Sequence, residues 1–394
     1  MTHVLMNSYA RITTGFTRGD GAWLYDAKEN RYLDALAGIA VCGLGHAHPA
    51  VKQAIASQAG QLLHTSNLYR IPLQEQLASR LVALAGMTNV FFGNSGAEAN
   101  EAAIKIARLH GHGQGFTNPV IIVMEGSFHG RTMATLSATG DPRVQKGFEP
   151  LLQGFRRVPY NDLEALEASA TQSCETVAVF VEPILGEGGI VIPDAGYLRG
   201  IRRICDANGW LMMLDEIQTG MCRTGKWFAC QHEDIVPDVM TLANALGNGF
   251  PIGACLAHGT AAGLIQPGHH GSTFGGNPLA SRVALTVLDT MEAHALDKRA
   301  AVLGNGMLEG FKKGLHDVNG IKAIRGRGMM LGIELDRPCS ELVAMALDEK
   351  LLINVTAGNV VRLLPPLIIS DEEADQIVST VCRLIRDFLN QSPG

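Results

Sequence analysis

Trp210-Leu-Met-Met-Leu-Asp-Glu-Ile-Gln-Thr-Gly220 is the segment that is most informative about the fold. Its apolar run ends in two adjacent carboxylates, as expected where a buried strand runs out into a polar loop. Short apolar runs that alternate with helical stretches predict an α/β fold, with helices on both faces of a mainly parallel sheet. The carboxyl ends of such strands form the ligand crevice, so residues at those ends, such as Glu125, Glu182 and Asp215, are candidates for a site. The other runs lie at 120–124, 177–181, 239–242 and 252–256.

Length and composition indicate a large domain with a smaller companion. At 394 residues the chain exceeds one ordinary core, and 46% hydrophobic with 18% charged residues is typical of a globular enzyme. After about Ala284 the pattern changes to a long amphipathic helix, a strand and a terminal helix over 371–390, and a hairpin is expected around 21–26. We therefore expect a large ligand-binding domain over 51–284, a small domain over 285–394, and an N-terminal segment, 1–50, that packs with the small domain.

Charge and cysteine content restrict the compartment and the partners. The formal net charge is −6 and the basic residues are scattered, so nucleic acid is not an expected partner. The eight cysteines include no CxxC pair and favour free thiols in a reducing cytoplasm. No signal peptide or long apolar run is visible, so no membrane association is expected. No metal site is expected either, because His110, His112, His269 and His270 lack partners at ligand spacing.

Two short segments have the residue types of a site for a flat, phosphorylated ligand. Ser95-Gly96-Ala97-Glu98 opens a predicted helix with capping-box spacing, and free N–H groups at a helix start favour a phosphate. The alternative is a well-capped helix without a ligand. In the loop 125–132, we interpret Phe128 as a cover for a flat ring and Arg131 as a partner for a carboxylate, rather than as a core residue and a surface charge.

Asp215 has two interpretations of about equal weight. A carboxylate at the tip of a buried strand is costly without a cationic partner, and a protonated pyridine nitrogen would be one. The alternative is a helix N-cap. The glycines of 241–253 have GxGxxxG spacing and no following ribose-binding acid, so a nicotinamide site is disfavoured. The segment 271–278 offers small and hydroxyl groups suited to a phosphate, or is simply a flexible loop.

In this order, the segments resemble the class III pyridoxal-phosphate aminotransferases, and most closely those of the acetylornithine type. The resemblance extends from Asn7-Ser-Tyr-Ala10 and Tyr32-Leu-Asp-Ala-Leu-Ala-Gly-Ile-Ala-Val41 to Arg362-Leu-Leu-Pro-Pro366. It implies the fold type I of aspartate aminotransferase, with a mainly parallel sheet of the seven-stranded type in the pyridoxal-phosphate-binding domain and a small α+β domain.

The resemblance also implies a role for each matching residue. Ser95, Gly96 and Ala97 would bind the cofactor phosphate, the last two through backbone N–H groups, and Phe128 would stack on the ring. Asp215 would pair with the ring nitrogen, and Gln218 would lie near the phenolic oxygen. The members of this family are homodimers with shared active sites, so Thr273 would reach the phosphate in the neighbouring subunit. The substrate would contact Arg131, Ser272, Arg362 and Glu187, of which Glu187 would pair with Arg362 when no carboxylate occupies that arginine.

The resemblance further implies a substrate class. Ornithine-type enzymes tend to carry a tyrosine where this chain has Gly38-Ile-Ala-Val-Cys42, so its absence favours N2-acetylornithine or succinylornithine over free ornithine. The expected reaction moves the terminal amino group of N2-acetylornithine to 2-oxoglutarate in arginine metabolism. Succinylornithine, ornithine and 4-aminobutyrate aminotransferases are the alternatives.

Asn244 departs from the family pattern. It occupies the position of the lysine that forms the Schiff base, and the flanking Leu242-Ala and Ala-Leu-Gly247 match the family. An amide can neither anchor the cofactor covalently nor transfer a proton. A substitution made to trap a ligand, a misrecorded lysine and a natural non-catalytic relative are three explanations. We predict that the chain with Asn244 is nearly inactive; the alternative function is a cofactor-binding protein without turnover.

Overall fold

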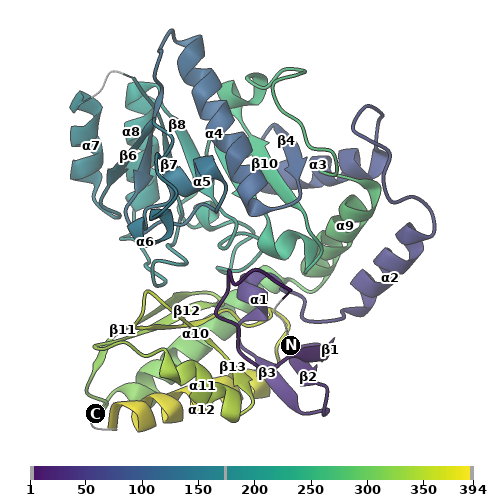
Figure 1. Ribbon diagram of the computed structural model, residues 1–394, viewed down its shortest axis with the longest axis vertical. Helices are drawn as coiled ribbons and strands as arrows, with labels where there is room; N and C mark the ends of the chain where they lie inside the picture. Colours follow the sequence, from purple (N-terminus) through teal and green to yellow (C-terminus); the bar gives the residue numbers. More distant parts are fainter. Residues whose placement is uncertain (1–3, 173–174, 391–394) are drawn as a thin grey trace.

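A seven-stranded sheet forms the core of the larger part of the molecule (Figure 1). The computed structural model describes residues 4–172 and 175–390. The strand order is β4-β10-β9-β8-β7-β5-β6; the neighbours from β9 to β6 pair in parallel, whereas β10 is antiparallel to both of its neighbours. This mixed, mostly parallel sheet confirms the predicted fold class. The strands are β4 Asn89–Gly93, β5 Val120–Met124, β6 Phe155–Val158, β7 Thr176–Val181, β8 Leu211–Asp215, β9 Val239–Leu242 and β10 Gly253–Ala257.

Helices cover both faces of this sheet. Successive side chains of a strand point to opposite faces, and in β5 Ile121 belongs to the hydrophobic cluster that contains α4 (Gly96–Gly113), while Ile122 belongs to the cluster of α8 (Tyr197–Asn208). Burial of both faces explains why the central strands are continuous apolar runs rather than alternating ones.

Two four-stranded sheets form the smaller part of the molecule. The first has the order β1-β2-β3-β13, and its parallel pair of β3 with β13 joins the N-terminal hairpin to the C-terminal region. The second has the order β11-β12-β15-β14. The antiparallel pair of β1 with β2 confirms the hairpin expected around 21–26. The strands are β1 Phe16–Asp20, β2 Trp23–Asp26, β3 Arg31–Asp34, β11 Ile321–Arg327, β12 Met330–Leu335, β13 Leu351–Leu352, β14 Asn354–Thr356 and β15 Val360–Leu363.

The terminal helix α12 spans Asp371–Asn390, as predicted. The predicted boundary between residues 284 and 285 falls within α9 (Pro278–Ala293), and the division into domains remains a prediction. The other helices are α1 Ala37–Ala40, α2 Pro49–Ala59, α3 Pro72–Ala85, α5 Met133–Ala138, α6 Pro142–Gln145, α7 Leu163–Gln172, α10 Leu296–Leu315 and α11 Glu341–Asp348, with short 3-10 turns η1 Ala229–His232, η2 Asn244–Gly247 and η3 Gly259–Gly263.

One buried guanidinium joins the two parts. Arg223 follows β8 and donates from Nη1 to the carbonyl oxygens of Met329 (3.1 Å) and Pro365 (2.6 Å). Burial lowers the pKa of Arg223 to about 10. The segment that carries Asp215 is therefore hydrogen-bonded directly to the segments that flank the second small sheet.

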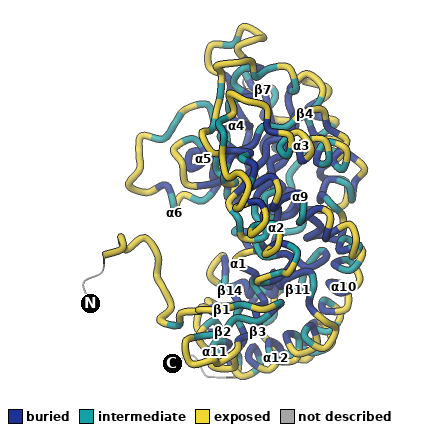
Figure 2. Tube along the Cα trace, turned by 90° about the vertical axis from the view of Figure 1, so that its right-hand side faces the viewer, coloured by how far each residue is buried: buried dark blue, intermediate teal, exposed yellow. Residues whose placement is uncertain are grey.

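The N-terminal arm is exposed. Figure 2 shows it standing away from the two lobes, and Val4 and Met6 are about 90% exposed. The cysteines of the described residues are free and mostly buried, whereas Cys174 lies outside the described part. In that part, no helix combines the length and the apolar character needed to span a bilayer.

Candidate active site

The carboxyl ends of the parallel strands open onto one cavity of about 660 Å³. Asp215 ends β8, the loop with Phe128 follows β5, and Asn244 follows β9. The helix α4 begins at the same cavity. Of the predicted site residues, the cavity wall contains Gly96, Ala97, Phe128, Arg131, Glu187, Asp215, Gln218 and Asn244.

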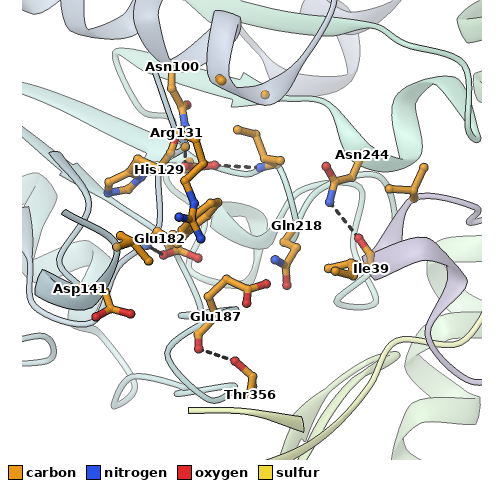
Figure 3. Close-up of a pocket in the computed structure, with 18 of the residues that line it drawn as sticks. Ile39, Asn100, His129, Arg131, Asp141, Glu182, Glu187, Gln218, Asn244 and Thr356 are labelled. Carbon is orange, nitrogen blue, oxygen red and sulfur yellow. Dashed lines mark hydrogen bonds and ion pairs between the residues drawn. The ribbon is translucent and has the colours of Figure 1, made fainter. Parts of the chain in front are cut away.

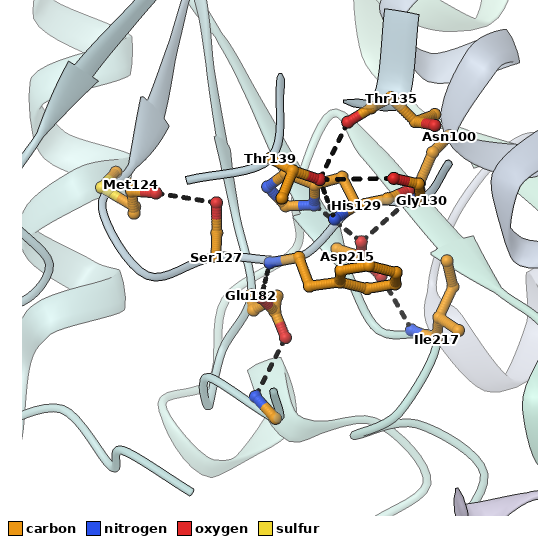
Figure 4. A network of polar contacts seen from close by, with 12 residues as sticks. Asn100, Met124, Ser127, His129, Gly130, Thr135, Thr139, Glu182, Asp215 and Ile217 are labelled. Atoms are coloured by element: carbon orange, nitrogen blue, oxygen red, sulfur yellow. Dashed lines mark hydrogen bonds and ion pairs between the residues drawn. The ribbon is translucent and has the colours of Figure 1, made fainter. Parts of the chain in front are cut away.

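Three donors hold the buried carboxylate of Asp215 (Figure 4). Its Oδ2 accepts from Nδ2 of Asn100 and lies 2.8 Å from Nδ1 of His129, and its Oδ1 accepts from the Ile217 N–H at 3.1 Å. The His129 ring stacks on Phe180 with ring centroids 4.2 Å apart. Because these contacts fix the carboxylate at the cavity wall, it can meet a further, cationic donor from a ligand without reorganising.

Glu182, at the end of β7, is a second buried carboxyl at this wall. Its oxygens accept from the N–H groups of Phe128 (2.8 Å) and Gly186 (3.0 Å). Burial, together with the charge of Asp215, raises the pKa of Glu182 to about 8. At neutral pH Glu182 is therefore largely protonated.

Arg362, at the end of β15, lies behind Glu187 and does not line the cavity. Its Nη1 lies 2.6 Å from Oε1 of Glu187, and its Nε and Nη2 donate to Oδ1 of Asn354. The Arg362 side chain is 1% exposed, whereas that of Glu187 is 36% exposed. A ligand carboxylate can therefore reach the guanidinium only when Glu187 turns away. Figure 3 shows Glu187 at the floor of the pocket, near Thr356.

Arg131 reaches the pocket from the loop after β5. Its guanidinium lies 5.5 Å from the centroid of the Phe128 ring and points into the pocket towards Glu182 and Glu187 (Figure 3). At the mouth, Asp141 pairs with Arg143, with Nη2 2.8 Å from Oδ2, so that this arginine is neutralised by a neighbour on its own loop.

The start of α4 forms the opposite wall. The Ser95 side chain accepts from the Glu98 N–H at 3.2 Å, but Glu98 accepts from the Asn94 N–H rather than from that of Ser95, so the predicted capping box is only half formed. In the described part of the chain, the N–H groups of Gly96 and Ala97 have no hydrogen-bond partner. These two donors are available to an anion.

Ser272 and Thr273 are not part of the cavity wall. Ser272 accepts from Asn94 Nδ2 (3.2 Å) and from the Gly275 N–H, and Thr273 is exposed. Ser95 likewise caps α4 from outside the cavity.

Sequence reasoning missed several wall residues. Glu182 was named as a candidate but was given no role, and His129 lies in the loop 125–132 without having been named. The position of Glu182 after a buried strand was a signal, as it was for Asp215. Asn100, Asp141 and Arg143 carry no sequence signal that would separate them from ordinary helix or loop residues.

The family profile described as aminotransferase class-III matches residues 5–385. This chain belongs to the class-III aminotransferases. It is 58% identical over 389 residues to the acetylornithine aminotransferase of Nitrosomonas europaea, covering 99% of each chain. The ornithine aminotransferase of Toxoplasma gondii superposes with a TM-score of 0.94 at 34% identity, over 98% of this chain and 93% of that one. The N-acetylornithine aminotransferase of Stenotrophomonas maltophilia gives 0.84 at 36% identity, over 97% and 98%.

Class-III aminotransferases use pyridoxal 5′-phosphate. The cavity of this aminotransferase fits that group without a covalent bond. A Cβ at Gly96 would lie 2.7 Å from Cδ1 of Ile217, so a side chain there would crowd the wall at the start of α4. Gln218 Oε1 is buried and lacks a partner in the described part of the chain, so it can accept from a ligand hydroxyl. At position 244 the cavity offers an amide and no amine.

Proposed function

We propose that this chain has the scaffold of an aminotransferase that moves the terminal amino group of N2-acetylornithine to 2-oxoglutarate, giving N-acetylglutamate semialdehyde and glutamate. The 58% identity over essentially the whole length of a relative named for the acetylornithine activity carries the proposal. Cytoplasmic arginine metabolism is the corresponding setting.

The wall residues have matching roles in this proposal. Pyridoxal phosphate, when bound, supplies an aldehyde that takes up an amino group and a ring that withdraws electrons. The free N–H groups of Gly96 and Ala97 would hold its phosphate, and Phe128 would cover the ring. Asp215 would keep the ring nitrogen protonated by pairing with it, and Gln218 would accept from the phenolic hydroxyl.

The arginines account for two different amino donors at one site. Arg131 would bind the carboxylate of the acylated substrate, while the Glu187–Arg362 pair stays closed. A dicarboxylate such as 2-oxoglutarate or glutamate would displace Glu187 and bind Arg362 in its place. Ser272 is proposed as a further substrate contact.

The substitution at 244 limits what this scaffold can do. A primary amine at this position would exchange with the substrate amine and carry a proton during transfer, whereas an amide does neither. Loss of a general acid–base group alone typically costs roughly 10²- to 10⁴-fold in rate. The Asn244 chain is therefore nearly inactive in this proposal.

The active form is a homodimer, in which Thr273 reaches the phosphate of the partner chain. Its support is an exposed apolar cluster beside Thr273, formed by Leu62, Leu63, Leu68, Tyr69 and Phe274. Asn67 ties the loop of Thr273 to this cluster by donating to the carbonyl oxygens of Ser272 and Gly275 at 3.0 Å.

The test is the variant Asn244→Lys, assayed with N-acetylornithine and 2-oxoglutarate beside succinylornithine, ornithine and 4-aminobutyrate. We expect its activity to exceed that of the Asn244 chain by at least about 100-fold, with an acylated ornithine as the best donor. Asn305→Lys, an exposed position on α10, is the matched control and should change nothing.

The outcomes separate the parts of the proposal. If Asn244→Lys holds the cofactor covalently after borohydride reduction but transfers amines from none of these donors, the substrate assignment is wrong. If the Asn244 chain is as active as the lysine variant, the prediction that the Asn244 chain is nearly inactive is wrong. If the lysine variant neither holds the cofactor covalently nor transfers amines, although the Asn244 chain binds the cofactor, a binding protein without turnover is the better description.

A further inference from the structure

The amide group of Asn244 forms a hydrogen bond to a strained turn through its NH₂ end. Its Nδ2 donates to the carbonyl oxygen of Ile39 at 2.9 Å (Figure 3). Ile39 lies in the left-handed turn α1 (Ala37–Ala40), with φ of 67° and ψ of 66°, where a β-branched residue is unfavourable. The hydrogen bond from Asn244 is therefore part of what holds this turn at the wall of the pocket.

This contact determines which way the amide faces. A backbone carbonyl can only accept, so the end of the amide that meets Ile39 must be the NH₂ end. Oδ1 must then face the other way, and Figure 3 shows it at the end of the amide that points away from Ile39. Oδ1 has no donor in the described part of the chain, and it remains free to accept.

The residues of the described chain that line the cavity provide no ammonium group near Asn244. Among the described residues that line the cavity there is no lysine; the carboxyl groups are those of Asp141, Glu182, Glu187 and Asp215, and the guanidinium groups are those of Arg131 and Arg143. The guanidinium groups that pair with Asp141 and Glu187 lie at the mouth and behind the floor. The wall that contains Asn244 thus presents a free acceptor and no ammonium group of its own among the described residues.

We propose that Asn244 makes the pocket selective for the aminated form of the cofactor, pyridoxamine 5′-phosphate, over its aldehyde form. The inference rests on the proposed function, because it takes the cofactor to occupy this cavity with its reactive carbon at position 244. An ammonium group can donate to Oδ1 of Asn244. An aldehyde oxygen is itself an acceptor, and it would face the lone pairs of Oδ1.

The amide cannot simply turn over to suit the aldehyde. Turning the amide over would place Oδ1 against the carbonyl oxygen of Ile39, so that two acceptors would meet and that carbonyl would lose its donor. The turn of Ile39 therefore keeps the amide in the orientation that favours an amine.

The test is calorimetric titration of the cofactor-free chain with pyridoxamine phosphate and with pyridoxal phosphate, in a buffer without amines. We expect pyridoxamine phosphate to bind about tenfold more tightly to the Asn244 chain, as estimated for a hydrogen bond from a charged donor. Asn244→Leu, which removes the acceptor at similar size, should bring the ratio close to one. Asn244→Asp, which keeps an acceptor, should retain the preference for the amine.

Thermal unfolding of each variant checks that it is folded, and Asn244→Ala replaces Asn244→Leu if the leucine is not tolerated. Equal affinities for the two forms, or tighter binding of the aldehyde, would overturn the inference while leaving the cofactor site intact. If neither form bound, the proposed function itself would fail. An unchanged preference in Asn244→Leu would show that other residues select the amine, and it would overturn the role of Asn244.

Discussion

At the scale of single residues, two carboxyl groups on neighbouring strands are held by different sets of donors. Asp215 is surrounded by side-chain and backbone donors that favour an anion, whereas Glu182 has two backbone donors, deep burial and the charge of Asp215 nearby. The difference matters for a ligand with a cationic ring nitrogen, because only one of the two groups can pair with it as an anion without first releasing a proton.

The raised pKa of Glu182 predicts a pH dependence of stability. Its pKa is about 8 in the folded chain against an ordinary value of 4.5, so between these values the folded chain retains a proton that the unfolded chain releases. Stability should therefore fall as pH rises through this window, by at most about 1.4 kcal/mol per pH unit. In Glu182→Gln this component of the decline should be absent, as measured by urea unfolding at about pH 5.5 and about pH 7.5.

The control is Glu164→Gln, an exposed carboxyl on α7, which should follow the parent chain. A parallel pH profile for Glu182→Gln and the parent chain would mean that Glu182 is ionised in the folded protein.

At the scale of elements, the first turn of α4 combines a capped end with open donors. Ser95 satisfies the N–H of Glu98, which leaves those of Gly96 and Ala97 for a ligand. Ser95→Ala should lower the free energy of unfolding by about 1 kcal/mol, because the cap is lost. Ser57→Ala, an exposed serine within α2, should stay within about 0.5 kcal/mol of the parent chain in the same denaturant titration. Equal effects of the two changes would argue against a capping role for Ser95.

Elements with a strong local pattern could be predicted from the sequence. The run 120–124 and the helix 371–390 coincide with β5 and α12 because their apolar residues recur at strand and helix spacing. The antiparallel direction of β10 could not be predicted, since a buried strand has the same composition whichever way it runs. The left-handed turn of α1 could not be predicted either, because isoleucine is rarely found in that conformation.

The same reasoning applies to the site. Phe128, Asp215 and Gln218 follow buried strands, so their convergence on one crevice could be expected. The partners that hold Asp215 could not be expected from the sequence. Asn100, for example, lies within α4 and meets the carboxylate only through the tertiary fold. The bond between Asn244 and Ile39 likewise joins residues 205 positions apart.

At the scale of the whole molecule, the exposed apolar cluster beside Thr273 predicts a two-chain particle. Light scattering should give twice the mass of one chain. Leu68→Asp, at a side chain that is 88% exposed in the single chain, should shift the mass towards one chain and weaken cofactor binding, because Thr273 of the partner would be lost. Val302→Asp changes an exposed valine on α10 and should leave both properties unchanged. A parent chain with the mass of one copy would contradict the proposed dimer.

The buried guanidinium of Arg223 has a consequence for the length of substrate that the pocket accepts. Arg223 follows Asp215 along the chain and donates to the carbonyl oxygen of Pro365, three residues beyond Arg362. In the proposed function, this bond helps to set the distance between Asp215, which would pair with the ring nitrogen, and Arg362, which would bind the distal carboxylate. The packing of one lobe on the other therefore fixes the distance between these two side chains. A change at Arg223, outside the cavity wall, would alter that distance and with it the length of substrate that the proposed enzyme prefers.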